Sequence, residues 1–321
     1  ERLAEINKVE KDIKTGMNFS FPWITSSVRT KIKRFTLSEA QEQWMRKRNK
    51  IRKTTRIINQ QGLTYFSEYL GNNIPLNSIT NTNIEGFIYS MESKGLSITT
   101  INMHLRTIKT MFRYWLKRDK LKRVPIIDQI SVRKVEPIYI TDEEFHNIMD
   151  IKWLDSFYKR VFMLYRETGM RLREPMISVL EGNWVDIPNE SKGKVSRNIE
   201  LDESLKTIFI EYNEWLVNGY GSTLVDAGDH VSKIFKKALK EIGANQKKHF
   251  HSLRHTFAVR RLIQGTSVYD LKLLMGHSSV TTTEVYSNMN LKRVSQDFPT
   301  IVDGYQKTTK LRFRDTDIRD T

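Results

Sequence analysis

The sequence predicts a mainly α-helical protein with two domains and one small β-sheet in the second of them. The chain has 321 residues, which is more than one compact core usually supports. Apolar residues recur at spacings of three and four through most of its length, as in helices with one buried face. The alternation typical of strands appears only between Trp184 and Leu201.

The composition indicates a folded protein with a polyanionic partner. Hydrophobic residues make up 39% of the chain and aromatic residues 10%, which is enough to build cores. The excess of 53 Lys+Arg over 37 Asp+Glu gives a formal net charge of +16, for which nucleic acid is the simplest partner. A basic protein that binds no nucleic acid is the alternative, because charge balance alone does not prove binding.

Several classes of protein are disfavoured. The chain has no cysteine, so it has neither disulfides nor Cys-ligated zinc, and nothing indicates an oxidising compartment. No stretch approaches the roughly 18 apolar residues that span a bilayer, and the start lacks a signal-peptide hydrophobic region. We therefore expect a cytoplasmic, nucleoid-associated protein. The chain begins with Glu1 rather than Met, and we expect that a preceding segment was removed or left out.

The first 34 residues are expected to form a leader. Residues 1–14 are charged and helix-prone, and the character changes at Thr15. From Phe35 to about Lys122 the pattern is helical without strand signals, which predicts an all-helical domain over residues 35–122. Similar helical patterns cover residues 44–70 and 84–91. A helix after Ser97 carries an apolar stripe, made of Ile98, Ile101, Leu105, Ile108, Phe112, Trp115 and Leu116.

Two cationic surfaces of this domain are candidates for DNA binding. Residues 46–56 hold seven cations and no acid, too many to be balanced by neighbours at helical spacing. A solvated helix face is the alternative, but phosphate contact explains the density better. The face opposite the apolar stripe is also basic. The predicted DNA-binding residues are Arg46, Lys47, Arg48, Lys50, Arg52, Lys53, Arg106, Lys109 and Arg113.

Residues 123–138, with Pro125 and Pro137, are predicted to form an extended linker, and residues 139–300 the second domain. That domain should open with a capping box at Thr141. A helix over 157–168 and a short one after Gly169 should follow. Strands at 184–187 and 195–201 should flank a polar turn at 188–193, and helices should continue to Tyr286. Residues 301–321 read as a polar tail.

Four motifs of the second domain hold the candidate catalytic groups. They are Thr168-Gly-Met-Arg171-Leu-Arg-Glu174, the turn with Lys192, His251-Ser-Leu-Arg254-His255, and Gly276-His277, which stands nine residues before Tyr286. This inventory suits attack of a tyrosine on a phosphodiester. Arginine forks stay protonated and pair with phosphate oxygens, so Arg171 and Arg254 can stabilise charge in the transition state. A phenol with a pKa of about 10 needs such cations and a base before it attacks.

The order and spacing of these motifs closely resemble the tyrosine recombinases, the phage integrase family, over roughly residues 36–290. The resemblance implies a helical core-binding (SAM-like) domain and a catalytic domain that form a C-shaped clamp on DNA. It implies that the leader is a remnant of an arm-type DNA-binding domain, with a flexible leader as the alternative. The tail would dock on a neighbouring protomer or be disordered.

The resemblance also implies a role for each site residue. Arg171, Lys192, His251, Arg254, His277 and Tyr286 would be catalytic: Tyr286 forms a 3′-phosphotyrosyl bond, Lys192 protonates the leaving 5′ oxygen, His251 assists proton transfer from the tyrosine, and His277 hydrogen-bonds the phosphate. Lys194 competes with Lys192. We expect Glu174 to orient a guanidinium, and His255 to pack beside the site. The sequence departs from the family at Pro175, which is tolerated in a first helical turn but would otherwise bend the segment.

The predicted function is therefore site-specific integration or excision of a phage or other mobile element, without metal, cofactor or ATP. Expected partners are double-stranded attachment sites, a homotetramer in the synaptic complex, and accessory DNA-bending or directionality proteins, with no membrane. The alternatives are a chromosome-dimer resolvase, a type IB topoisomerase-like enzyme, and a DNA-binding regulator that does not cut. A zinc site at His251, His255 and His277 is disfavoured, because no carboxylate or cysteine nearby completes it.

Overall fold

The computed structural model describes residues 2–14, 35–132, 135–188, 196–218, 223–287 and 289–303. The chain divides into two compact units, Glu1–Arg133 and Lys134–Thr321. Helix α1 (Arg2–Lys14) confirms the helical start of the leader. The rest of the leader, the turn with Lys192 and Lys194, and the tail beyond residue 303 lie outside the described residues. Among the described helices, none is long and apolar enough to cross a membrane.

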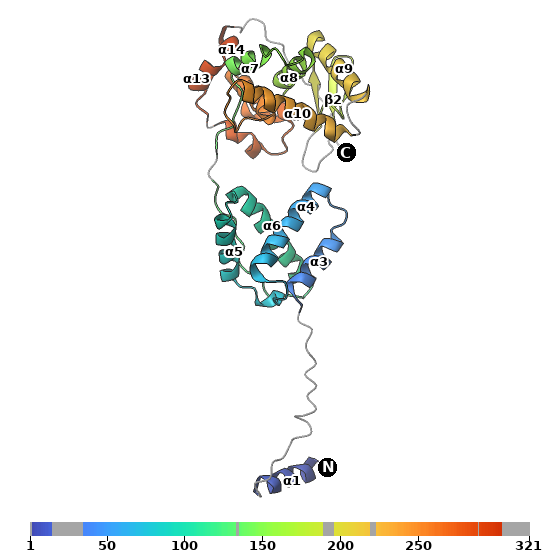
Figure 1. The fold of residues 1–321 in the computed structure, drawn as a ribbon, viewed down its shortest axis with the longest axis vertical. Coiled ribbons are helices and arrows are strands. Elements are labelled where there is room, and N and C mark those ends of the chain that lie inside the picture. Colours follow the sequence, from blue (N-terminus) through green and yellow to red (C-terminus); the bar gives the residue numbers. More distant parts are fainter. Residues whose placement is uncertain are drawn as a thin grey trace. The chain divides into compact units, whose positions relative to one another are not determined.

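The first unit is a helical domain built around one long central helix (Figure 1). That helix, α6 (Ile98–Leu116), packs against α3 (Leu37–Lys47), α4 (Lys53–Leu70) and α5 (Asn81–Ser93), and a short 3₁₀ turn, η1 (Leu76–Ser78), precedes α5. Its core is aromatic, because Trp44, Phe66, Phe87 and Phe112 are fully buried. The described part of this unit contains no strand, which confirms the all-helical prediction.

The helix boundaries of the first unit differ from the prediction in two places. The pattern over residues 44–70 is divided between two helices, because α3 ends at Lys47 and α4 begins at Lys53. Repulsion between cations at spacings of three and four residues disfavours a continuous helix there. In α6 the middle of the predicted stripe is buried, whereas its end residues Ile98 and Leu116 are 39% and 37% exposed.

The predicted linker is extended but is anchored to the first unit over its first half. The Ile126 amide donates to Asn81 Oδ1 at 2.8 Å, and the Asn102 side chain pairs with the backbone of Ile130 at 2.8 and 2.9 Å. Lys109 Nζ donates to the carbonyl of Ile127, a buried residue, at 2.5 Å. Residues 126–130 therefore belong to the helical unit rather than to a free connection.

The second unit combines helices with one small sheet. Its larger helices are α7 (Asp142–Met149), α8 (Ser156–Thr168), α9 (Glu203–Asn218), α10 (Leu224–Glu241), α11 (His251–Ile263) and α12 (Val268–Met275). Short elements follow, namely η2 (Val280–Thr282), η3 (Glu284–Tyr286), α13 (Leu291–Val294), η4 (Ser295–Asp297) and α14 (Pro299–Asp303). Within this unit the sheet and α9 lie at one end, and α13 and α14 at the other (Figure 1).

The sheet has three antiparallel strands in the order β1 (Val179–Glu181), β2 (Trp184–Ile187) and β3 (Arg197–Glu200). Val185 pairs with Ile199, and both side chains are buried in the core of the unit. The strand predicted at 184–187 is confirmed, whereas the one predicted at 195–201 is shorter, because β3 covers residues 197–200 and residue 195 lies outside the described residues. Strand β1 was missed, because its three residues are too few to show alternation and none of them is fully buried.

Two local predictions in this unit have opposite outcomes. The capping box at the start of α7 is confirmed, with the Glu144 amide 3.1 Å from Thr141 Oγ1 and the Thr141 amide 2.9 Å from Glu144 Oε2. The short helix predicted after Gly169 is wrong, because residues 172–177 form turns. Pro175 lacks the amide hydrogen that a continuing helix would need, which is a physical reason for the difference.

Candidate active site

Four segments of the second unit bring the candidate residues together. Helix α8 ends at Thr168 and is capped by Gly169, whose left-handed φ of 64° turns the chain into the segment with Arg171. Helix α11 begins at His251 and carries Arg254 and His255. Helix α12 ends at Met275 and is capped by Gly276, which is also left-handed with a φ of 59°. The loop after it leads through His277 to Tyr286. Strand β3 brings Arg197 to the same place.

Arg171 is held by its neighbour Glu174. The Arg171 amide donates to Glu174 Oε2 at 2.7 Å, and its Nη1 donates to Glu174 Oε1 at 2.6 Å. Its Nη2 lies 3.4 Å from the carbonyl oxygen of Gly276, so the guanidinium also touches the loop that carries His277. Glu174 thus orients this arginine as expected, although from a turn and not from a helix.

Glu174 is the shared counter-ion of a cluster of arginines. Arg197 donates to both of its carboxylate oxygens, at 3.1 and 2.7 Å, and Arg254 Nη1 lies 4.0 Å away. Burial alone would raise the pKa of Glu174, but hydrogen bonds and charge from Arg197, and then the charge of Arg254, hold it at about 2. The carboxylate is therefore ionised at neutral pH and offsets part of the buried positive charge.

Arg197 is a residue of the site that sequence reasoning missed. It is only 6% exposed and occupies the first position of β3, two residues before the buried Ile199. Residues two apart on a strand share a face, so the register places Arg197 on the side of the core. A signal was present in the sequence, since an arginine in an inward-facing position needs a buried partner.

Arg254 lies at the centre of the cluster and is 2% exposed. Its Nη1 donates to the Gly169 carbonyl at 2.6 Å, and its Nη2 donates to the Met275 carbonyl and lies 3.1 Å from His277 Nε2. Burial, together with the charges of Arg171 and Arg197, lowers the pKa of Arg254 to about 9, which leaves it protonated at neutral pH. One guanidinium therefore ties together the ends of α8 and α12.

His277 is fixed from both sides of its ring. Its Nε2 faces Arg254, and its Nδ1 lies 2.9 Å from the hydroxyl of Thr283, a fully buried residue. Because a guanidinium can only donate, Nε2 accepts and the neutral ring carries its proton on Nδ1. The loop between α12 and Tyr286 is thereby anchored to α11 at its first residue.

Tyr286 is buried and contacts a histidine. The residue is 2% exposed, and its hydroxyl lies 2.7 Å from Nδ1 of His255. Burial raises the pKa of this phenol to about 12, against a smaller lowering effect of Arg254. The structure therefore gives His255 a direct contact with the candidate nucleophile, where the sequence had suggested only packing beside the site.

His251 lies next to His255 at the start of α11. The two rings meet edge to face, with centroids 5.0 Å apart and an angle of 90°. His251 also stacks with His249, with the ring centroids 6.4 Å apart. In the described part of the chain, the three histidines of the predicted zinc alternative are not arranged as a metal site, since no group of three or more His, Cys, Asp or Glu there could hold a metal ion.

The histidines make the second unit sensitive to acid. Burial, followed by nearby cations and rings, lowers the pKa to about 4 for His251 and to about 3 for His255 and His277, from an ordinary value of 6.5. Below pH 6.5 these histidines bind protons in the unfolded chain but stay neutral in the folded one. The free energy of unfolding therefore decreases as the pH falls from 6.5 towards 3. We expect the urea midpoint to fall over this range, and His255→Asn and His277→Asn each to flatten the profile. An unchanged midpoint between pH 6.5 and 5 would contradict this.

Substitution of Gly169 should also reduce the stability of the second unit, in which the Gly169 carbonyl accepts a hydrogen bond from Arg254. A Cβ at this position would lie 2.4 Å from the Phe257 ring, at a φ of +64°. Gly169→Ala should lower the free energy of unfolding by about 1–2 kcal/mol from backbone strain and by about 1–3 kcal/mol more from the clash. Gly182→Ala is the matched control, because its φ is +63° and nothing lies within 4 Å. Equal losses in the two variants would show that the clash contributes nothing.

The predicted DNA-binding residues lie in the first unit, mostly at its surface. Arg46 pairs with Glu42 at 2.6 Å in an exposed ion pair, and the Arg48 guanidinium lies 4.6 Å from the centre of the Trp44 ring. Lys109 also holds the linker, as described above, and Arg106 donates to Gln129 at 3.2 Å. The remaining predicted residues are exposed, namely Lys47, Lys50, Arg52, Lys53 and Arg113.

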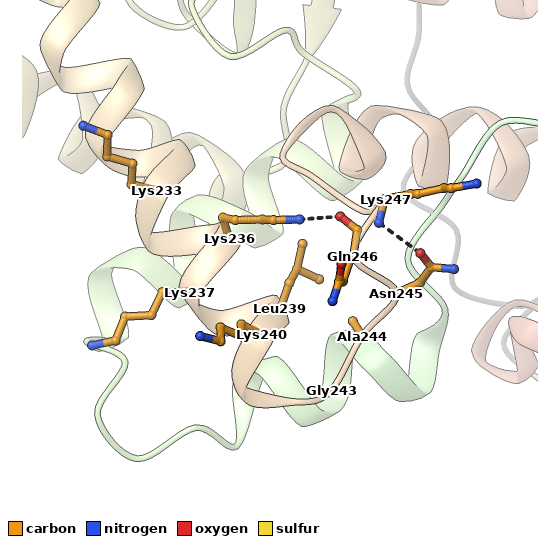
Figure 2. A pocket seen from close by; sticks show the side chains of 10 residues that line it. All are labelled: Lys233, Lys236, Lys237, Leu239, Lys240, Gly243, Ala244, Asn245, Gln246 and Lys247. Carbon is orange, nitrogen blue, oxygen red and sulfur yellow. Dashed lines mark hydrogen bonds between the residues drawn. The ribbon is translucent and has the colours of Figure 1, made fainter. Parts of the chain in front are cut away.

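A lysine-rich hollow of about 1080 Å³ lies elsewhere on the second unit. Figure 2 shows lysines of α10 on one side and the loop over residues 243–247 on the other. Lys236 crosses between them, since its Nζ donates to the Gln246 and Lys248 carbonyls at 2.6 and 2.8 Å. None of the five described catalytic candidates lines this hollow, so it is separate from the arginine cluster.

Comparison with known proteins identifies the family that this chain matches. Residues 139–293 match the phage integrase family, and residues 36–129 match the phage integrase SAM-like domain. The tyrosine recombinase XerC of Thermodesulfovibrio yellowstonii is 25% identical over 237 residues, covering 66% of this chain and 78% of the relative. The tyrosine recombinase XerD of Oceanobacillus iheyensis is 24% identical over 239 residues, covering 67% and 80%.

Solved structures show the same fold. The Tn1549 transposon integrase in complex with circular intermediate DNA has a TM-score of 0.63 at 18% identity, covering 82% of this chain and 98% of that one. A lambda integrase tetramer bound to a Holliday junction has a TM-score of 0.62 at 16% identity, covering 88% of each chain. These likenesses agree with the predicted mainly α fold with a small sheet, which the structure confirms.

Proposed function

Because the chain belongs to the tyrosine recombinase, or phage integrase, family, whose members are DNA strand-exchange enzymes, we propose that it cleaves and rejoins DNA through Tyr286. The observation that carries this proposal is the convergence of Arg171, Arg254, His277 and Tyr286 from three separate segments of the second unit. The motifs stand far apart in the sequence, and a tyrosine with only a structural role does not require buried arginines and histidines around it.

The arginines would hold the scissile phosphate. Its non-bridging oxygens gain negative charge in the transition state, and fixed guanidinium groups stabilise that charge without having to reorganise. Glu174 and the carbonyls of Gly169 and Met275 already orient Arg171 and Arg254. His277, held between Arg254 and Thr283, would hydrogen-bond the same phosphate through Nε2, once that nitrogen carries a proton and gives up its contact with Arg254.

Tyr286 would attack the phosphorus, form a 3′-phosphotyrosyl bond and release a 5′ oxygen, which Lys192, or its competitor Lys194, would protonate. His251 would assist proton transfer at the tyrosine. The phosphodiester energy is retained in the new bond, so religation to another strand requires neither ATP nor a metal. Burial of Arg254 and Tyr286 strengthens their interactions with the phosphate, because the local dielectric is low.

The first unit would act as the core-binding domain, over residues 35–122, with the catalytic domain over residues 139–300, and the two would form a clamp on duplex DNA. The exposed cations at the junction of α3 and α4 support phosphate contacts that position the protein without reading sequence. The solved relatives were captured on DNA, one of them as a tetramer on a Holliday junction. We propose a tetramer in the synaptic complex for this chain too.

Within the family we propose integration and excision of a mobile element. A charged helix, α1, precedes the SAM-like region, as in an integrase with an arm-binding segment. Resolution of chromosome dimers is the second candidate, and it is favoured by the likeness to XerC and XerD. Recombination of paired attachment sites, compared with recombination of a chromosomal dimer-resolution site of the same host, would separate the two.

The chemistry is tested with a nicked suicide substrate that traps the covalent intermediate. The parent should form a protein–DNA adduct on a denaturing gel, and Tyr286→Phe should form none. Tyr269→Phe is the matched control, because this tyrosine is 61% exposed and lies outside the cluster. Tight binding of a verified site without any adduct would contradict the enzyme proposal and favour a DNA-binding regulator. Strand exchange between two sites then separates a recombinase from a topoisomerase.

A further inference from the structure

The sequence motifs did not predict the hydrogen bond between His255 and Tyr286, because His255 was expected only to pack beside the site. His255 Nδ1 and the Tyr286 hydroxyl are 2.7 Å apart, and the two rings are tilted by 55° with centroids 5.8 Å apart. The tyrosine is buried, so water does not compete for its proton. A phenol that attacks phosphorus must lose that proton to a group within hydrogen-bond reach.

His251, which the resemblance to the family implies as the residue that assists proton transfer, does not reach the phenol. His251 packs edge-on against His255 and makes no hydrogen bond to Tyr286 among the described residues. His255 therefore stands between the other histidine and the phenol. The charged and titratable groups that act on it are His251, His249 and Arg254, and none of them is a carboxylate that could take the proton instead.

We propose that His255 accepts the proton of Tyr286 as the phosphotyrosyl bond forms. This inference rests on the proposed function. The phenolic O–H bond breaks and an N–H bond forms at Nδ1 of His255, while the tyrosyl oxygen bonds to phosphorus and the bond from phosphorus to the 5′ oxygen breaks. The leaving oxygen takes a separate proton from a general acid. When the strand is rejoined, His255 returns its proton to the phenol.

The resting site keeps the proton on the phenol. Burial and the neighbouring histidines lower the pKa of His255 to about 3, and burial raises that of Tyr286 to about 12. A bound phosphate adds negative charge, which favours a protonated imidazole. The phenol also becomes far more acidic as its oxygen bonds to phosphorus. Transfer is thereby coupled to the attack, and the nucleophile stays protected until DNA is bound.

The test combines His255→Asn with a more acidic phenol at position 286. Asparagine offers an oxygen near the position of Nδ1 but cannot take a proton, and trifluorotyrosine at 286 ionises more readily. On the nicked substrate, single-turnover cleavage by His255→Asn should be slower by on the order of 10²–10³-fold, with unchanged DNA affinity. Trifluorotyrosine should recover at least tenfold of that loss and should give no comparable gain in the parent. A variant with His251→Asn, made in parallel, should be rescued far less than His255→Asn, because His251 contacts His255 and makes no hydrogen bond to Tyr286 among the described residues.

Three results would overturn the proposal. Cleavage by His255→Asn within threefold of the parent would show that the histidine is dispensable. A slow variant that trifluorotyrosine does not rescue would make His255 a positioning residue only. Faster cleavage would make the hydrogen bond a restraint on the nucleophile. Failure of the proposed function itself looks different, because the parent would then form no adduct, or Tyr286→Phe would still form one. Thermal unfolding of each variant checks that the fold is kept.

Discussion

Glu174→Gln should be among the most destabilising single substitutions in the second unit. Glu174 is 4% exposed, accepts from Arg171 and Arg197 and lies 4.0 Å from Arg254. Removing its charge leaves these guanidinium groups close together without a buried counter-ion. Breaking a buried ion pair in this way costs roughly 3–5 kcal/mol. Urea unfolding of the full chain, followed by tryptophan fluorescence, measures the loss at neutral pH.

The same variant should show a defined pH dependence. The folded pKa of Glu174 is about 2, below its ordinary value of 4.5, so its stabilising effect is complete above pH 4.5 and is lost as the pH falls towards 2. The difference between parent and variant should therefore shrink in that window. Glu214→Gln, at an exposed position of α9, should change stability little at any pH. Equal losses in the two variants would contradict the shared counter-ion.

Arg254→Lys should remove most of the cleavage activity while the positive charge is kept. The guanidinium reaches Gly169, Met275 and His277 at once, and a lysine ammonium cannot reproduce this planar fork. Losing a fork that stabilises phosphoryl transfer costs on the order of 10³–10⁵ in rate. Single-turnover cleavage of the nicked substrate measures the effect, with DNA affinity determined separately by titration.

Arg173→Lys is the matched control for this substitution. Arg173 lies two residues from Arg171, but its side chain is 54% exposed and pairs with Asp229 at 3.4 Å on the surface. Its replacement should leave cleavage within a few-fold of the parent. If Arg254→Lys were equally mild, Arg254 would have to act as a structural cation only, and transition-state stabilisation would have to come from other groups.

Local structure followed closely from local sequence. The capping box at Thr141, the helix over residues 157–168 and the strands around the turn after Ile187 all depend on hydrogen bonds and patterns within a few residues. Three features were predicted wrongly, because their signals in the sequence are weak. They are the three-residue strand β1, the break between helices at the cationic run after Lys47, and the turns around Pro175. In each case tertiary packing or charge repulsion decided between close alternatives.

By itself, the sequence determined which chemical groups the protein carries and the order in which it carries them. Those groups suit phosphoryl transfer by a tyrosine, and their order and spacing resemble those of the tyrosine recombinases. Their assignment as catalytic residues stays a prediction, and Lys192 lies outside the described residues.

Only the tertiary structure decided which residues of the site contact one another. Arg197 joins the cluster because β3 pairs with β2 in a register that turns residue 197 inward, and this register depends on packing across the sheet. His255, rather than His251, meets Tyr286 because the loop after α12 folds back onto α11. Sequence spacing measures distance along the chain, whereas hydrogen bonds depend on distances of about 3 Å in space, and folding sets those through contacts between residues far apart in sequence.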